Sequence, residues 1–187
     1  MGKSINYHIV NTPYTDLKID YVSFFRKELT SIEGVEKYEH MHILSVSSNF
    51  IESLKELKNI KHPEWVTKLI CDNNKIESLE GIEHLTNLKF LKCNGNIIKS
   101  LEPLKTLTKL TEIQCYNNDL ESLKGIENLS GLDTLMIAGN PCEIKYRGLT
   151  AQEIVERVKL ESCLEVGNDR RGEASILDTG LFDFKIK

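Results

Sequence analysis

The amino-acid sequence predicts an α/β solenoid, in which one short unit is repeated along the chain. Residues 66–87 and 88–109 align with a shift of 22, and eight positions agree in type, order and spacing. A fixed period of this length is typical of a solenoid and outweighs local signals. The paired positions are Val66 with Leu88, Leu69 with Leu91, Cys71 with Cys93, Asn74 with Asn96, Ile76 with Ile98, Leu79 with Leu101, Ile82 with Leu104 and Leu85 with Leu107.

The same pattern extends in both directions and predicts about six units. The first unit is atypical, because Lys27 stands where later units have asparagine. The second unit is longer than the others, and its three extra residues lie within Lys61–Trp65, where an insertion is expected to form a loop. The last unit ends after Asn140, where Pro141 follows. The predicted units are 19–40, 41–65, 66–87, 88–109, 110–131 and a truncated unit from 132, so that repeats cover 19–141.

The first 18 residues are expected to cap the open end of the first unit. Ile5, Tyr7 and Ile9 alternate with polar residues, which is typical of a short strand, and Pro13 then breaks the pattern. A terminal repeat has no neighbour on one side, so a capping segment is expected there. The sequence therefore predicts an N-terminal flank over 1–18 that contains a strand.

The C-terminal segment, residues 142–187, is expected to close the other end with a helix over about 150–162. Thr150 and Glu153 have the spacing of a capping box. Apolar residues follow at helical spacing, namely Ile154, Val155 and Val158. Residues 168–172 indicate a turn. The chain then ends in a tail of strand-like alternation, carried by Phe182, Phe184 and Ile186.

Within each unit, positions 3–7 are predicted to form a short parallel strand. Strand side chains alternate, so positions 4 and 6 should point into the core, and positions 3, 5 and 7 should form the concave face. The asparagine at position 9 turns the chain off the strand, and its amide can satisfy buried turn backbone. The convex half should form loops and 3-10 turns. The asparagines are Asn49, Asn74, Asn96, Asn118 and Asn140.

The pattern L-x-x-L-x-L-x-x-N-x-I/L-x-x-L resembles a leucine-rich repeat. Over about 19–141 the units are similar to the 22-residue repeats of the protein phosphatase regulators called SDS22-like, and to those of bacterial internalins. Asn140-Pro141 and Tyr146-Arg147 echo the C-terminal cap of eukaryotic members. The resemblance implies a curved right-handed solenoid with a parallel sheet on its concave face, and a role in binding proteins.

Composition and charge narrow the classes of function. The chain has 187 residues, a net charge of −4 and no basic cluster, which argues against a nucleic-acid partner. The start lacks the apolar segment of a signal peptide, and no stretch approaches 18 apolar residues, so we expect neither export nor a membrane span. The odd count of five cysteines fits a reducing compartment. We therefore expect an intracellular protein, cytoplasmic or nuclear.

No catalytic, cofactor or metal site is predicted. The three cysteines at position 6 should stack in one column and serve as small apolar core residues, since no fourth ligand completes a zinc site. None of the five histidines stands in a metal-binding frame, and no nucleotide-binding or nucleophile motif is present. These cysteines are Cys71, Cys93 and Cys115. The other two, Cys142 and Cys163, are expected to stay reduced even if the cap brings them together.

The concave face carries the candidate functional site. Four adjacent strands should present apolar or aromatic side chains there, namely Ile70, Phe90, Tyr116 and Met136, beside Lys68, Lys89 and Lys92. Apolar groups next to charge on such a face are typical of a protein interface. The predicted partner-binding residues are Trp65, Lys68, Ile70, Asp72, Phe90, Lys92, Asn94, Gln114, Tyr116 and Met136.

These expectations favour a monomeric, non-enzymatic adaptor that binds a protein or peptide on its concave face, with the phosphatase regulators as the implied analogy. Three alternatives remain open. One is a pathogen effector built on the same repeats. Another is an enzyme whose active site lies in the terminal segments, around His8 or Asp169. The third is a self-assembling protein that pairs through the C-terminal alternating segment.

Overall fold

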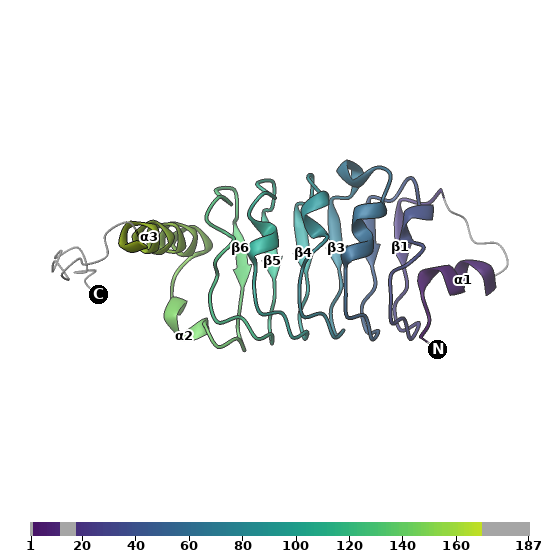
Figure 1. Cartoon of the computed structure of the whole chain (residues 1–187), viewed down its shortest axis with the longest axis horizontal. Helices are drawn as coiled ribbons and strands as arrows, with labels where there is room; N and C mark the ends of the chain where they lie inside the picture. Colours follow the sequence, from purple (N-terminus) through teal and green to yellow (C-terminus); the bar gives the residue numbers. More distant parts are fainter. Residues whose placement is uncertain (1, 12–17, 170–187) are drawn as a thin grey trace.

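The computed structural model describes residues 2–11 and 18–169 and shows one elongated solenoid, with helices α1 and α3 at opposite ends (Figure 1). Six strands form a single parallel sheet in chain order, one strand in each predicted unit. The α/β solenoid predicted from the 22-residue period is therefore confirmed. The strands are β1 (Tyr21–Ser23), β2 (Ile43–Ser45), β3 (Lys68–Ile70), β4 (Phe90–Lys92), β5 (Glu112–Gln114) and β6 (Thr134–Met136).

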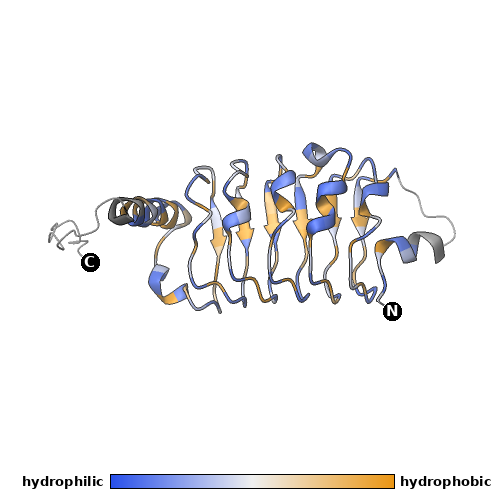
Figure 2. Ribbon diagram, viewed as in Figure 1, coloured by the Kyte–Doolittle hydropathy of each residue, from blue (hydrophilic) through white to orange (hydrophobic). Residues whose placement is uncertain are grey.

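The inward side of the sheet forms a continuous hydrophobic core. Leu69 and Cys71 at positions 4 and 6 are fully buried, as are their counterparts Leu91 and Cys93 in the next unit. The strands are shorter than predicted and cover positions 3–5 only, but backbone pairing continues, since Cys71 N–H donates to the Lys92 carbonyl at 2.8 Å. Figure 2 shows the resulting pattern of hydrophobic strands between hydrophilic connections.

The position-9 asparagines form a buried ladder that ties consecutive units together. The Asn96 amide donates to the carbonyls of Cys71 and Cys93, both at 3.0 Å, and its oxygen accepts from Ile76 N–H at 3.1 Å. Every asparagine in the column donates in this way to carbonyls of its own unit and of the preceding one. The predicted role of the asparagines, to satisfy buried turn backbone, is confirmed.

Position 8 forms the corner between the strand and the asparagine. In all six units this residue has a positive φ, and the six residues are Arg26, Ser48, Asn73, Gly95, Asn117 and Gly139. Only two of the six are glycines, so the repeat geometry imposes a left-handed conformation that L-residues adopt at some cost.

The convex half consists of loops and 3-10 turns, as predicted. The turns are η1 (Val35–Lys37), η2 (Lys55–Asn59), η3 (Pro63–Trp65), η4 (Ile82–His84) and η5 (Glu102–Leu104). Each is short, and most place a single apolar residue in the core, such as Leu57 of η2 and Ile82 of η4. The additional turn η3 lies in the predicted insertion and carries the only tryptophan of the chain.

The strand predicted at the N-terminus is wrong, because Ile5–Asn11 form the helix α1. Ile5 is fully buried whereas Tyr7 is exposed, so the alternating residues do not share one face. The Ser4 hydroxyl accepts a bond of 3.3 Å from Tyr7 N–H, which is the N-cap geometry of a helix. Asn6 N–H also donates to the Glu33 carbonyl at 2.8 Å, so the cap packs on the first unit as a helix.

The C-terminal cap consists of α2 (Glu143–Tyr146) and α3 (Ala151–Asp169). The capping box is confirmed, because Thr150 N–H donates to Glu153 at 2.8 Å and Glu153 N–H donates to the Thr150 hydroxyl at 3.3 Å. The helix extends beyond the predicted end near residue 162, so the residues 168–169 that were expected in a turn are helical. The alternating segment 182–186 lies outside the described residues.

Candidate functional site

The strand register places the predicted binding residues side by side on the concave face. Lys68 of β3 pairs with Phe90 of β4, and Ile70 pairs with Lys92. Gln114 of β5 pairs in the same way with Met136 of β6. The side chains at these six positions are all half-buried. The 22-residue spacing therefore predicted the neighbours on this surface correctly.

Lys68, Ile70, Phe90 and Lys92 form a checkerboard of charge and apolar surface, which we call the central square. Its two lysines lie on one diagonal, and Phe90 and Ile70 lie on the other. The Lys68 ammonium is 4.0 Å from the centre of the Phe90 ring, which is a cation–π contact. This contact holds the Lys68 side chain over the sheet.

A second hydrogen-bond ladder runs along position 7 of the concave face. Asp72 N–H donates to the Ser47 hydroxyl at 3.1 Å, and Asn94 N–H donates to an Asp72 carboxylate oxygen at 2.8 Å. Tyr116 N–H then donates to the Asn94 side-chain oxygen at 2.8 Å. We did not predict this ladder, although three consecutive units with an acceptor side chain at position 7 are a usable signal.

The position-7 ladder changes the role of two candidate residues. Asp72 is only 8% exposed, and its carboxylate also lies 3.2 Å from the Lys92 ammonium. The Asp72 carboxylate is therefore bound within the sheet, and its predicted role in partner binding stays a prediction. Asn94 is half-buried, and its side-chain oxygen accepts a hydrogen bond from Tyr116 N–H.

Trp65 forms an aromatic cluster with three histidines, which we call the Trp65 platform. The ring of Trp65 stacks on that of His62 with centroids 4.1 Å apart and planes at 12°. His42 stacks at 6.2 Å and 7°, and His40 at 5.7 Å and 26°. The sequence did not reveal this cluster, because the histidines come from two units and meet only when the insertion folds over the edge of the sheet.

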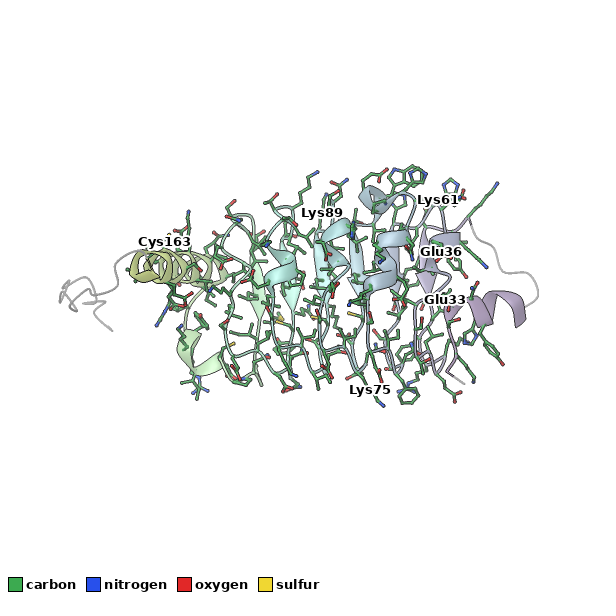
Figure 3. All side chains as sticks on the ribbon, viewed as in Figure 1. Glu33, Glu36, Lys61, Lys75, Lys89 and Cys163 are labelled. Carbon is green, nitrogen blue, oxygen red and sulfur yellow. The ribbon has the colours of Figure 1, made fainter. Side chains whose placement is uncertain are left out.

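The Trp65 platform is continuous with the central square. The carbonyl of His42 accepts hydrogen bonds from Thr67 N–H at 2.9 Å and from Lys68 N–H at 3.3 Å. The strands begin at this edge of the solenoid, where Figure 3 shows Lys61 and Lys89. A ligand on the central square can therefore reach the platform without crossing another strand.

The N-terminal end of the concave face exposes two further aromatic residues that are not among the predicted binding residues. Tyr21 at position 3 and Phe25 at position 7 of the first unit are each about half exposed. The Arg26 guanidinium lies 5.0 Å from the centre of the Phe25 ring. These residues enlarge the aromatic surface, but β2 separates them from the central square.

The three cysteines of the column, Cys71, Cys93 and Cys115, are buried in the apolar core, which makes their thiols poorly reactive. Burial raises the pKa of all three thiols, to about 12 for Cys115, so they remain protonated near neutral pH. All five cysteines are free, and Cys163 is exposed while Cys142 is buried. Within the described part of the chain, no group of three or more histidine, cysteine, aspartate or glutamate side chains is arranged to hold a metal ion.

Comparison with known proteins supports the fold. A family described as leucine-rich repeats (two copies) matches residues 64–106. No curated protein matches the chain. Residues 64–106 thus match leucine-rich repeats, and the six-stranded sheet with its asparagine ladder continues the same leucine-rich-repeat fold on both sides. Across the two described ranges, no helix is long and apolar enough to cross a membrane.

Three solved structures illustrate the likeness. An internalin from Listeria monocytogenes is 21% identical with a TM-score of 0.61, over 65% of this chain and 35% of that one. A leucine-rich-repeat protein from Leptospira interrogans is 20% identical with a TM-score of 0.60, over 75% of this chain and 36% of that one. The functional domain of InlJ from L. monocytogenes, which includes a cysteine ladder, is 20% identical with a TM-score of 0.53. The likeness covers 60% of this chain and 24% of that one. The chain thus spans about a third or less of the length of these proteins, and the likeness concerns the fold alone.

Proposed function

We propose that the protein is a non-catalytic interaction module that binds another protein, or a peptide of it, on the concave face. The observation that carries this proposal is the central square, in which Phe90 and Ile70 lie beside Lys68 and Lys92 on one rigid sheet. Apolar and aromatic groups mixed with charge are typical of the centre of an interface. The other contact residues in the proposal are Trp65, Asn94, Gln114, Tyr116 and Met136.

Rigidity supports a binding role for this surface. Each strand is held by parallel pairing with its neighbours, and the position-9 and position-7 ladders fix the turn that follows. Side chains on such a frame are already near their bound positions, so little conformational entropy is lost when a partner docks. A solenoid offers such an extended surface because each unit adds one strand to it.

The size of the face indicates the kind of partner. Six strands about 4.8 Å apart span roughly 24 Å, and the five residues of positions 3–7 span about 16 Å, which gives roughly 400 Å². One side of a standard interface is about 800 Å², so the strands alone suit a short peptide or one helix. The Trp65 platform enlarges the surface toward the size that a folded partner needs.

More specifically, we propose that the protein is a monomeric adaptor of the kind that regulates a phosphatase. We also propose that it acts inside the cell. Support for a reducing compartment comes from the five free thiols, since an oxidising one favours disulfides. We assign the module no cofactor, metal ion, nucleic acid or membrane partner.

The proposal is tested by affinity capture from cell lysate with three forms of the protein. The first is the wild type, and the second is the Phe90→Ala/Tyr116→Ala variant, which removes the aromatic groups of the concave face. The third is Phe50→Ala/Ile144→Ala, which removes exposed apolar side chains elsewhere. Circular dichroism confirms that all three fold.

The expected result is a partner that the wild type and the Phe50→Ala/Ile144→Ala control retain and the concave-face variant loses. A partner retained equally by all three forms would place the site elsewhere. Failure of the wild type to retain any specific partner would contradict the adaptor role.

A further inference from the structure

We propose that the concave face recognises an acidic segment of its partner, in which carboxylates are interleaved with apolar side chains. This inference rests on the function proposed above and specifies the chemistry of the ligand. It follows from the distribution of charge on β3 and β4, from the spacing within the central square, and from the position of one glutamate on β5.

The charge of the central strands is opposite to that of the whole chain. The protein has 24 lysines and arginines against 28 aspartates and glutamates. The outward positions 3, 5 and 7 of the two units that contain β3 and β4, with the residue before each strand, however carry three lysines, namely Lys68, Lys89 and Lys92. They carry only one carboxylate, that of Asp72. This carboxylate is buried and already bound to Lys92. Among the described residues, Lys68 and Lys89 make no ion pair, so their charges are available to a ligand.

The spacing within the central square sets the pattern of the ligand. Neighbouring strands lie about 4.8 Å apart, and diagonal positions are about 7–8 Å apart. Lys68 and Lys92 occupy such a diagonal, with Phe90 and Ile70 on the other. Carboxylates two residues apart in an extended segment, about 7 Å, or four residues apart on a helix, about 6 Å, match this diagonal. One carboxylate then pairs with Lys68, and the other reaches the exposed part of Lys92, beside Asp72. The remaining positions of the segment then contact Phe90 and Ile70.

Glu112 limits how far the acidic part of the ligand can extend. It pairs with Phe90 in the register, on the side away from Lys68, and its carboxylate accepts a bond of 2.6 Å from Gln114. A ligand carboxylate over β5 would face this charge. Farther along, Tyr116 and Met136 present apolar surface. We therefore orient the segment with its acidic part over β3 and β4 and its apolar part over β5 and β6.

The Trp65 platform extends the positive end of the site. Lys89 lies on the edge where the strands begin, and Lys89 N–H donates to the Thr67 carbonyl at 2.9 Å, one residue away from Lys68. The imidazoles of His40 and His42 are exposed at the same edge and can donate hydrogen bonds to carboxylates. The acidic end of the segment is therefore expected to reach this edge.

The test uses three fluorescent 12-residue peptides that share one phenylalanine and one leucine and differ only at six other positions, which are all Glu, all Gln or all Lys. Binding to the full chain is measured by fluorescence anisotropy at 50 mM and 300 mM NaCl. We expect the Glu peptide to bind at least about tenfold more tightly than the Gln peptide, and the Lys peptide not to bind. The difference should shrink at the higher salt concentration.

Charge-reversal variants locate the site. Lys68→Glu/Lys89→Glu should lower the affinity for the Glu peptide by at least about tenfold. The matched control Lys58→Glu/Lys105→Glu alters net charge equally, at exposed positions away from the concave face, and should bind like the wild type. Circular dichroism confirms folding, and the milder Lys68→Gln/Lys89→Gln variant should show an intermediate loss. Equal weakening by the control would overturn the assignment.

Two further outcomes separate this inference from the proposed function. If Glu and Gln peptides bind equally and Phe90→Ala/Tyr116→Ala abolishes both, the acidic specificity is wrong and the concave binding site stands. If no peptide binds, or if a 12-nucleotide single strand displaces the Glu peptide at equal concentration, the acidic-segment inference is wrong. The lysate experiment then decides separately whether the face binds a protein.

Discussion

The Asp72 carboxylate lies 3.2 Å from the Lys92 ammonium, across two neighbouring strands of the concave face. Asp72 also accepts the backbone N–H of Asn94 at 2.8 Å, so a single buried side chain links the charge of the face to its hydrogen-bond ladder. Lys92 is more than a third exposed, so solvent screens the ion pair, and the hydrogen bond contributes the larger share of stability.

Asp72→Ala should lower the free energy of unfolding by about 1–3 kcal/mol, because Asn94 N–H loses its acceptor in a partly buried place. Asp72→Asn keeps an acceptor oxygen and should cost less than about 1 kcal/mol, the loss of a screened ion pair. Urea titration followed by circular dichroism measures both. Equal losses in the two variants would show that charge, and not the hydrogen bond, is what matters.

Asn96→Ala should destabilise the protein by about 3 kcal/mol or more, since three carbonyls and one N–H lose a partner in a buried turn. Asn128→Ala serves as the control, because Asn128 is exposed and makes one long bond of 3.4 Å to the Lys105 carbonyl. Its cost should stay within about 0.5 kcal/mol. Similar values for the two variants in urea unfolding would contradict the structural role of the ladder.

Gly81→Ala should cost about 2 kcal/mol or more. Gly81 has a φ of 103°, and a methyl group there would lie 2.4 Å from the Leu54 carbonyl oxygen of the preceding unit. Gly131→Ala is the matched control, because nothing lies within 4 Å of the added methyl. Thermal unfolding should show a clear drop in Tm for Gly81→Ala only. A similar Tm for both variants would mean that the units are packed less closely at this point.

Thiol labelling should report the burial of the cysteine column. In the native protein at pH 8, Ellman's reagent should react rapidly with Cys163 alone, because the other four thiols are buried. All five should react in guanidinium chloride. The Cys163→Ala variant should remove the fast phase. Rapid reaction of a second thiol in that variant would show that the C-terminal end of the core opens readily.

Stability should fall as the pH rises above about 9. Burial raises the folded-state pKa of the Cys115 thiol to about 12, whereas an unfolded thiol ionises near 8.5. The unfolded state therefore loses its proton first, and stability that is fully present below about pH 8.5 is lost as the pH approaches 12. Between these two pKa values, each buried thiol lowers the free energy of unfolding by up to about 1.4 kcal/mol per pH unit.

The test of this pH dependence is urea unfolding between pH 8 and 11. Cys93→Ala removes a thiol whose pKa is also raised by burial, so its stability should fall less steeply than that of the wild type. Gly131→Ala adds no ionisable group and no close contact, so it should keep the wild-type slope. An identical slope in all three proteins would contradict the proposed burial effect.

The contacts of the central square could be predicted because they depend only on spacing. Lys68 and Phe90 are 22 residues apart and occupy the same position in consecutive units, so parallel pairing brings them together. Alternation likewise predicted that Leu69 points inward. By contrast, three alternating residues at the N-terminus were too few to distinguish a strand from a helix, and the Ser4 cap was the signal that we did not use.

The sequence by itself determined the period, the register of the sheet, the core positions and the composition of the concave face, because a solenoid repeats one local rule and each unit contacts its neighbours. Only the tertiary structure decided what lies outside that rule. Trp65 meets histidines of two units, and α1 packs on the first unit. These contacts join residues at unequal separations along the chain, which no repeat spacing encodes.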